Sequence, residues 1–112
     1  MDYTTILSAL AEPNRLQIVE LLRMGPLTVG EIADHLHIRQ PQASKHLRVL
    51  FKAGMVEFSV EANRRIYNLR SEPFKALDLW LKKYRDIWEE KFDNLDRYLH
   101  DLQQRENKRN EN

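Results

Sequence analysis

The sequence predicts a mainly α-helical fold with one small β-hairpin and a long C-terminal helix. Apolar residues recur with helical spacing in four short segments, and a later stretch alternates apolar with polar residues, as strands do. A third pattern, with apolar residues seven positions apart, indicates the long helix. The 112 residues, 42% of them hydrophobic, are enough for one domain. We expect that domain at residues 1–103 and a polar, disordered tail at residues 104–112.

The first two helices precede a Gly-Pro turn. The first has one apolar stripe that needs a partner surface, and the stripe consists of Tyr3, Ile6, Leu7 and Leu10. The second is expected to begin at Pro13, because proline suits the first turn of a helix. It is expected to end before Gly25-Pro26, which is typical of a turn.

The next two helices form a helix-turn-helix, because only a tight turn separates them. Thr28 and Glu31 have the spacing of a capping box, which starts the third helix and leads it to Leu36. The fourth helix is expected from Gln40 to Ala53, where Gly54 follows as a C-terminal cap. Its inward face is expected to consist of Ala43, Leu47, Leu50 and Phe51.

A two-stranded hairpin follows the fourth helix. Residues 56–60 alternate apolar and polar side chains, Ala62-Asn63-Arg64 is typical of a turn, and Arg65 to Leu69 is rich in β-forming residues. Helix, helix, tight turn, helix and hairpin is the order of elements in a winged helix-turn-helix domain. The fold class is therefore a winged helix-turn-helix with a long C-terminal dimerisation helix.

The long helix is expected from Phe74 to Leu102, with Phe74, Leu81, Trp88, Leu95 and Leu102 seven residues apart. At about 1.5 Å per residue it would be about 43 Å long, which is more than a domain of this size covers unaided. We therefore expect dimerisation through this helix, and the apolar stripe of the first helix also needs a partner surface. The expected interface residues are Tyr3, Ile6, Leu7, Leu10, Leu77, Leu81, Tyr84, Trp88, Leu95 and Leu99.

Positive charge is concentrated in the middle of the chain. The net charge is only +1, but residues 37–70 hold seven basic and two acidic residues, for a net charge of +5. These bases lie on the fourth helix and the hairpin, which favours binding of a polyanion over a merely solvated surface. The outward face of an α-helix fits the major groove of B-DNA, where Gln can pair with adenine and Lys with guanine.

These considerations predict a set of DNA contacts. We assign base edges or nearby phosphates to Gln40, Gln42, Ser44 and Lys45. Arg48 and Lys52 are assigned chiefly to phosphates, and Arg64 and Arg65 to the flanking minor groove or its phosphates. His46 lies near the buried edge of the helix, so that a packing or capping role and a phosphate contact both stay open.

Several classes of function are excluded by composition. The chain has no cysteine, so it has no disulfide, thiolate nucleophile or cysteine-ligated metal. No Ser/His/Asp arrangement or glycine-rich phosphate loop is present, and we expect neither an enzyme nor a cofactor. No apolar run approaches the ~20 residues of a membrane helix, and no signal peptide is visible, so we expect a cytoplasmic protein.

Several motifs occur in a specific order along the chain. They are Glu12–Leu16, Leu27–Ala33, Gln40–Leu50, Ala53–Val56, Arg64–Leu69 and Trp80–Glu90. Together they resemble the ArsR-type winged-helix repressors of bacteria over residues 3–102, and the last is similar to a cysteine-free branch. The resemblance implies a homodimer that binds a palindromic operator on double-stranded DNA of the nucleoid and represses transcription.

The sequence departs from the metal-sensing relatives in that family. They place cysteines on the helix equivalent to residues 28–36, or paired His and carboxylate ligands along the dimer helix. Neither pattern is present, because the long helix has one histidine, His100, and His35 and His37 would point in different directions on a helix. A metal site needs three or four converging ligands. We expect no metal site, and ordinary surface roles for these three histidines.

Two alternative functions stay open. The heptad helix could capture a different protein, in which case the chain is an interaction adaptor and its basic face is incidental. Alternatively, a small organic effector could release a repressor from DNA, with Trp80, Tyr84 and Trp88 lining its pocket. Aromatic residues at helical spacing usually pack an interface, so packing is the expected role of these three.

Overall fold

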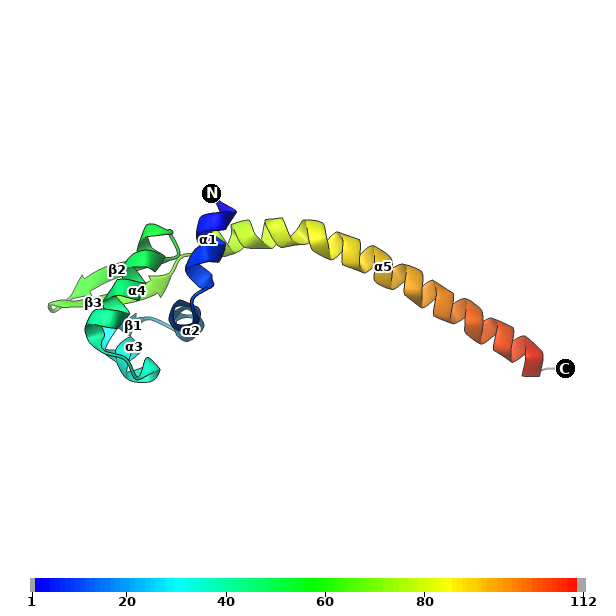
Figure 1. Cartoon of the computed structure of the whole chain (residues 1–112), viewed down its shortest axis with the longest axis horizontal. Helices are drawn as coiled ribbons and strands as arrows, with labels where there is room; N and C mark the ends of the chain where they lie inside the picture. Colours follow the sequence, from blue (N-terminus) through cyan, green and yellow to red (C-terminus); the bar gives the residue numbers. More distant parts are fainter. Residues whose placement is uncertain (1, 111–112) are drawn as a thin grey trace. The chain divides into compact units, whose positions relative to one another are not determined.

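The structure, a computed structural model, describes residues 2–110. These residues belong to two compact units, the first ending at Leu77 and the second beginning at Asp78. Figure 1 shows the elements, which are α1 (Tyr3–Leu10), α2 (Pro13–Leu22), β1 (Leu27–Thr28), α3 (Val29–Leu36), α4 (Gln40–Lys52), β2 (Val56–Glu61), β3 (Arg64–Leu69) and α5 (Glu72–Asn110). The predicted fold class, a winged helix-turn-helix with a long last helix, is confirmed.

The last helix is longer than the sequence pattern indicates. Helix α5 begins at Glu72 and continues to Asn110, whereas the heptad pattern places its ends at Phe74 and Leu102. Residues 104–110, expected as a disordered tail, are therefore helical, and residues 111–112 lie outside the described part of the chain. Most of the residues from Gln103 to Arg109 are Gln, Arg, Glu or Lys, which favour a helix without any apolar partner.

Local hydrogen bonds fix where the first helices meet. The Glu12 carboxylate accepts from the Arg15 backbone N–H at 2.8 Å, which caps the start of α2. Arg15 in turn donates from Nε to the Ala9 carbonyl at 2.7 Å and from Nη2 to the Ser8 carbonyl at 3.3 Å. These carbonyls lie in the last turn of α1, where the Ser8 carbonyl also accepts from the Ala11 backbone N–H at 3.2 Å, so one arginine adds a side-chain donor to the end of the helix.

The predicted capping box of α3 is confirmed. The Thr28 hydroxyl accepts from the Glu31 backbone N–H at 3.2 Å, and the Glu31 carboxylate accepts from the Thr28 N–H at 3.0 Å. Thr28 also belongs to β1, a strand that the sequence analysis does not predict. In this strand Leu27 pairs with Tyr67 and Thr28 with Ile66.

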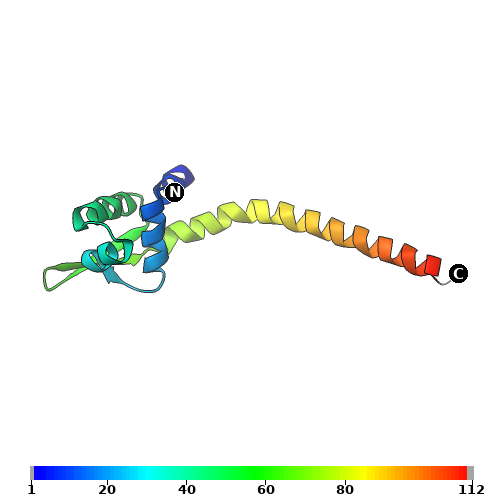
Figure 2. The same cartoon turned by 60° about the horizontal axis from the view of Figure 1, so that its bottom comes forward.

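The sheet has three antiparallel strands in the order β1-β3-β2. Figures 1 and 2 both show β2 and β3 side by side as a hairpin. The turn consists of Ala62 and Asn63, both with positive φ values of 46° and 68°. Arg64, expected in the turn, is the first residue of β3 and pairs with Glu61. A two-residue turn with this left-handed backbone matches the natural twist of the two strands.

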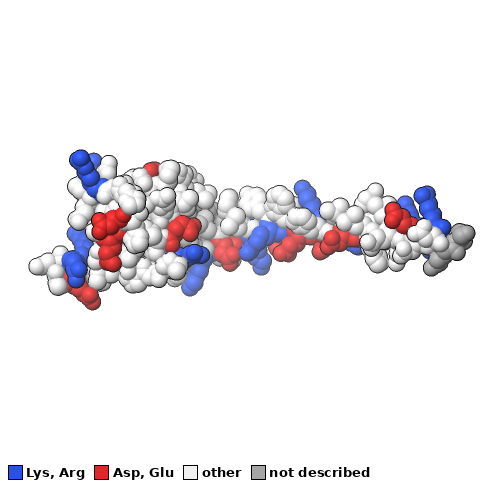
Figure 3. Space-filling model, turned by 90° about the horizontal axis from the view of Figure 1, so that it is seen from below, with Lys and Arg blue, Asp and Glu red and all other residues white. Residues whose placement is uncertain are grey.

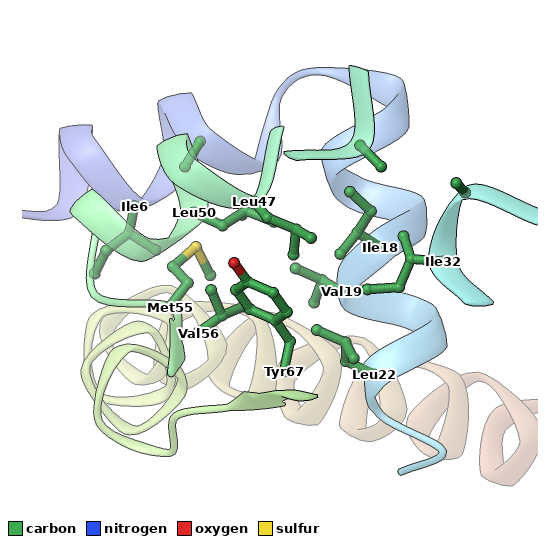
Figure 4. Packing of buried hydrophobic residues seen from close by; sticks show 13 residues of the cluster. Ile6, Ile18, Val19, Leu22, Ile32, Leu47, Leu50, Met55, Val56 and Tyr67 are labelled. Carbon is green, nitrogen blue, oxygen red and sulfur yellow. The ribbon is translucent and has the colours of Figure 1, made fainter. Parts of the chain in front are cut away.

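The core of the first unit joins α1, α2, α3, α4 and the sheet. Figure 4 shows its central side chains, among them the fully buried Ile6, Ile18, Ile32, Leu47, Leu50 and Met55. Two expectations about this core are wrong. Ile6 is fully buried within its own protomer, so it is not available to a dimer interface. Phe51 is 48% exposed, because it lies on the flank of α4 that faces the hairpin and not on the buried face.

The second unit is the part of α5 that begins at Asp78. Its large apolar side chains are exposed, and they include Leu81, Tyr84, Ile87, Trp88, Phe92, Leu95, Tyr98 and Leu99. Some of its aromatic rings contact one another along the helix, as Trp88 and Phe92 do with ring centroids 6.3 Å apart. These contacts within the helix do not cover the side chains. An apolar stripe at heptad spacing therefore stays exposed along the described part of this unit.

Candidate nucleic-acid interface

Helix α4 presents two polar faces beside its buried one. Residues three, four and seven apart share a helix face, so Gln40, Ser44, Arg48 and Phe51 form one flank. This flank faces the hairpin, because its residues line hollows together with hairpin residues. Lys45 and Lys52, seven residues apart, form a neighbouring exposed stripe. The predicted polar and cationic surface of α4 therefore consists of two parts.

Two predicted contact residues of α4 have partners inside the protein. The Gln42 Oε1 accepts from the Arg39 backbone N–H at 3.2 Å and so helps to cap α4. His46 is half-buried, with its Nδ1 3.6 Å from the Glu12 carboxylate at the start of α2. The geometry of His46 agrees with the packing role that the sequence left open, whereas Gln42 keeps its amide nitrogen as a donor for another group.

Arg64 and Arg65, the two arginines at the start of β3 in the hairpin, have different surroundings. The Arg65 guanidinium carbon lies 4.5 Å from the centroid of the Phe58 ring, a cation–π geometry that restrains the side chain. Arg64 is exposed and lies near Glu31. The hydrogen bond from the Thr28 N–H holds the pKa of the Glu31 carboxyl below its ordinary value, and the positive charge of Arg64 lowers this pKa further.

Two adjoining hollows lie between α4 and the hairpin. The first, which we call the cleft, has a volume of about 490 Å³ and is lined by Val29, Ser44, Arg48, Phe51, Phe58, Arg65 and Tyr67. The second has a volume of about 630 Å³ and is lined by Thr28, Val29, Gly30, Glu31, Gln40, Ser44, Asn63, Arg64 and Arg65. Of the predicted contact residues, the fold thus brings together Gln40, Ser44, Arg48, Arg64 and Arg65.

The Gln40 side chain at the start of α4 lies close to Gly30 of α3. A Cβ atom at Gly30 would lie 3.3 Å from the Gln40 Nε2, closer than ordinary van der Waals contact. Lys52 lies at the other end of α4, where it lines a hollow with Thr4 and Ser8 of α1. The predicted contact residues therefore span the whole length of α4, from the α3 side to the α1 side.

Basic side chains lie at the hairpin end of the first unit. Figure 3 shows Lys and Arg side chains beside Asp and Glu side chains on one face of the first unit, and both signs also occur along α5. The sequence analysis missed Phe51 and Phe58 as parts of this surface. Residue spacing could have indicated Phe51. It lies seven residues after Ser44 and three after Arg48, and residues with this spacing share one face of a helix.

The proposed interface residues of α1 and α5 differ in exposure. Tyr3 and Leu7 are exposed, while Leu10 and Leu77 are partly buried against the core of the first unit. The remaining five, Leu81, Tyr84, Trp88, Leu95 and Leu99, are exposed on the second unit. Apart from Ile6, all these residues thus keep surface that a partner could cover.

Metal-binding clusters and membrane-spanning helices are both absent from residues 2–110. Within that range, no group of three or more His, Cys, Asp or Glu side chains lies close enough together to hold a metal ion. His37 ends α3 in a left-handed conformation with φ 56°, and it lines a small hollow with Asp34 and His35. No described helix is both long and apolar enough to span a membrane.

The sequence of the domain matches known regulators. Residues 12–57 match the family described as "Bacterial regulatory protein, arsR family". Over 76 residues the chain is 41% identical to the HTH-type transcriptional regulator Rv2034 of Mycobacterium tuberculosis, a match that covers 68% of this chain and 71% of that protein. The chain belongs to the ArsR family. It is a transcriptional regulator and not an enzyme.

Other ArsR-family proteins are similar over a comparable length. The arsenical resistance operon repressor of Staphylococcus xylosus is 32% identical, with 63% of this chain and 68% of that protein covered. Among solved structures, the ArsR family transcriptional regulator RHA00566 has a TM-score of 0.68 at 31% identity, covering 77% of this chain and 89% of that one. The homodimeric winged helix-turn-helix DNA-binding domain of Mb0332 from Mycobacterium bovis has a TM-score of 0.61 at 31% identity, covering 74% and 77%.

Proposed function

We propose that this ArsR-family chain is a homodimeric, sequence-specific repressor that binds a palindromic operator in the cytoplasm. One observation carries the proposal: exposed Arg48 on α4 and exposed Arg64 and Arg65 on the hairpin line adjoining hollows of the first unit. Such a basic surface, built from a helix-turn-helix and a wing, is suited to the sugar-phosphate backbone. Two similar proteins, the arsenical resistance operon repressor of Staphylococcus xylosus and the homodimeric DNA-binding domain of Mb0332, support the same function.

The proposed contacts follow from the position of each side chain. Lys45, exposed on the outer stripe of α4, is assigned to a base edge in the major groove, with Gln40, Gln42 and Ser44 at base edges or nearby phosphates. Arg48 and Lys52 are assigned to phosphates. Arg64 and Arg65 are assigned to the flanking minor groove or its phosphates.

We propose that the dimer forms through α1 and α5. The exposed heptad stripe of the second unit is long enough to need a second helix as cover, and Tyr3 and Leu7 are exposed apolar side chains of α1 in the first unit. In a two-fold dimer the recognition helices would be about 34 Å apart and would contact half-sites about 10 base pairs apart. The operator is therefore expected to be an imperfect palindrome.

We also propose that metal ions do not regulate this protein. The chain has no cysteine, and no metal-ligand cluster occurs among residues 2–110. The single histidine of α5, His100, lies 3.1 Å from the Gln104 amide nitrogen. Addition of Zn²⁺ or arsenite should leave operator affinity unchanged, and a change of tenfold or more at micromolar metal would contradict this part of the proposal.

A salt titration of DNA binding tests the main proposal. We expect the protein to bind genomic fragments, to protect a palindrome from nuclease, and to lose affinity steeply as salt rises. Lys45→Ala should lower affinity for the protected site more than affinity for random DNA. No measurable DNA binding at ~0.1 M salt would contradict the repressor function and favour the adaptor alternative.

The dimer is tested with neighbouring leucines of α5. Leu81→Asp places a charge on the heptad stripe and should produce monomers in sedimentation equilibrium. Leu79→Asp is the matched control, because Leu79 is exposed on the opposite face of the same helix turn. If both variants stay dimeric, or the wild type is a monomer, α5 is not the interface.

A further inference from the structure

Three aromatic rings form one wall of the cleft between α4 and the hairpin. The centroid of Phe51 on α4 lies 5.3 Å from that of Phe58 on β2, and Phe58 lies 5.5 Å from Tyr67 on β3. Both pairs are tilted by nearly 50°, a favourable arrangement for aromatic contacts. Tyr67 is buried beneath, but about half of Phe51 is exposed to solvent. The cleft therefore offers an aromatic surface that the fold itself leaves uncovered.

Two guanidinium groups lie beside this aromatic wall. Arg65 is stacked on Phe58, which fixes its position on the hairpin side. Arg48 lines the cleft from α4, and the half-buried Ser44 adds a hydroxyl one turn earlier on the same flank. None of the seven lining residues, all in the described part of the chain, is acidic. The cleft thus combines an aromatic wall with two positive charges, one from α4 and one from the hairpin.

This combination selects one chemical class of ligand. A carboxylate can accept paired hydrogen bonds from a guanidinium, whereas an aromatic ring can pack on Phe51 and Phe58. A volume of about 490 Å³ lies within the usual range of small-molecule sites. A free inorganic anion would leave the aromatic wall exposed, and a neutral aromatic compound would leave both cations without a partner.

We propose that the cleft binds an aromatic carboxylate of one or two rings, and that this ligand releases the protein from DNA. The release part rests on the proposed DNA-binding function, because Ser44, Arg48 and Arg65 are also proposed DNA contacts. A bound carboxylate occupies both guanidinium groups and adds a negative charge where a phosphate would lie. The ligand and the DNA backbone therefore compete directly, with no conformational change required.

Direct binding is measured first, without DNA. The probe is 2-naphthoate, and the uncharged 2-naphthamide is the control ligand with the same rings. Isothermal titration calorimetry of the full chain should show one naphthoate per protomer, bound at least about tenfold more tightly than the amide because of the charge-assisted hydrogen bonds. Amide NMR shifts should change at Phe51, Phe58 and Arg65 and leave the second unit unaffected.

Variants locate the site. Arg48→Ala should weaken naphthoate binding about tenfold or more, since it removes one charge-assisted partner. Lys45→Ala is the matched control, because it removes the same charge from the neighbouring stripe of α4, which does not line the cleft. Phe58→Leu removes the ring and should also weaken binding. If this variant fails to fold, Arg65→Lys tests the hairpin side of the cleft instead, because it keeps the charge but loses the planar guanidinium.

The competition is measured by fluorescence anisotropy with operator DNA at constant salt. Saturating naphthoate should raise the apparent Kd for DNA about tenfold or more in the wild type, and 2-naphthamide should not. Equal binding of the two probes, no naphthoate binding at millimolar concentration, or unchanged binding in Arg48→Ala would overturn the ligand site. DNA binding without probe is recorded in the same assay, so failure of the proposed function is seen separately.

Discussion

Replacing Arg64 and Arg65 together by Ala removes two exposed cations from the hairpin of each protomer. A dimer then loses four cations, and the slope of log K against log salt should become shallower by about 3.6 if each one contacts a phosphate, at about 0.9 per contact. When salt rises from ~50 to ~200 mM, the wild type should therefore lose about 150-fold more DNA affinity than the variant does. The double substitution should reduce the affinity for operator and for random DNA by a similar factor, because phosphate contacts are independent of sequence.

The single variants divide this effect between the two side chains. Each single variant removes one cation per protomer, so Arg64→Ala alone should account for about half of the change in slope, or about 1.8. The assay is fluorescence anisotropy at five salt concentrations. Lys82→Ala with Lys83→Ala is the control, because it removes the same charge from α5. An unchanged slope in the hairpin double variant would refute the placement of DNA against the wing.

Three other predictions concern the recognition surface and the domain that supports it. Lys45→Ala should reduce discrimination between operator and random DNA by about 1–3 kcal/mol in competition binding, and equal losses on both DNAs would make Lys45 a phosphate contact. Leu47→Ala empties a fully buried position and should lower the free energy of unfolding in urea by roughly 2–5 kcal/mol. Glu31 has a lowered pKa, so its stabilising effect is present above the ordinary glutamate pKa and is lost as pH falls through the lowered one. Glu31→Gln should therefore flatten the acid limb of a stability-against-pH curve from thermal melts, and an unchanged acid limb would contradict the capping role.

Helix boundaries were the most predictable part of the fold. Asp2, Glu12 and Thr28 each cap a helix with a side-chain oxygen, and a capping signal is local in sequence. Strand β1 was not predictable, because two residues show no periodicity and their partner Tyr67 is far along the chain. The end of α5 was misplaced for another reason, since polar residues such as Gln104 and Arg105 extend a helix without any apolar signal.

The candidate site was predictable in its charges but not in its geometry. Periodicity places Lys45 and Arg48 outward correctly, because α4 is regular and its buried face is apolar. Periodicity alone assigns Phe51 to the buried face of α4. In the structure Phe51 lies on the neighbouring flank, which faces the hairpin, and residue spacing does not show where the hairpin packs. The contact of Arg65 with Phe58 depends on strand pairing, and the Gln42 cap depends on a rotamer. Neither can be obtained from residue spacing.

The core has a consequence for how such a protein could change its target. Among the described residues, no charged side chain is buried, and within the buried cluster only Tyr67 carries a polar group on its side chain, so the interior of the first unit is held together mainly by apolar packing. Apolar interiors tolerate exchange of one hydrocarbon side chain for another of similar volume. Preference for a new operator could therefore arise at Lys45 and its exposed neighbours while the scaffold keeps its stability, and the two properties are free to evolve independently.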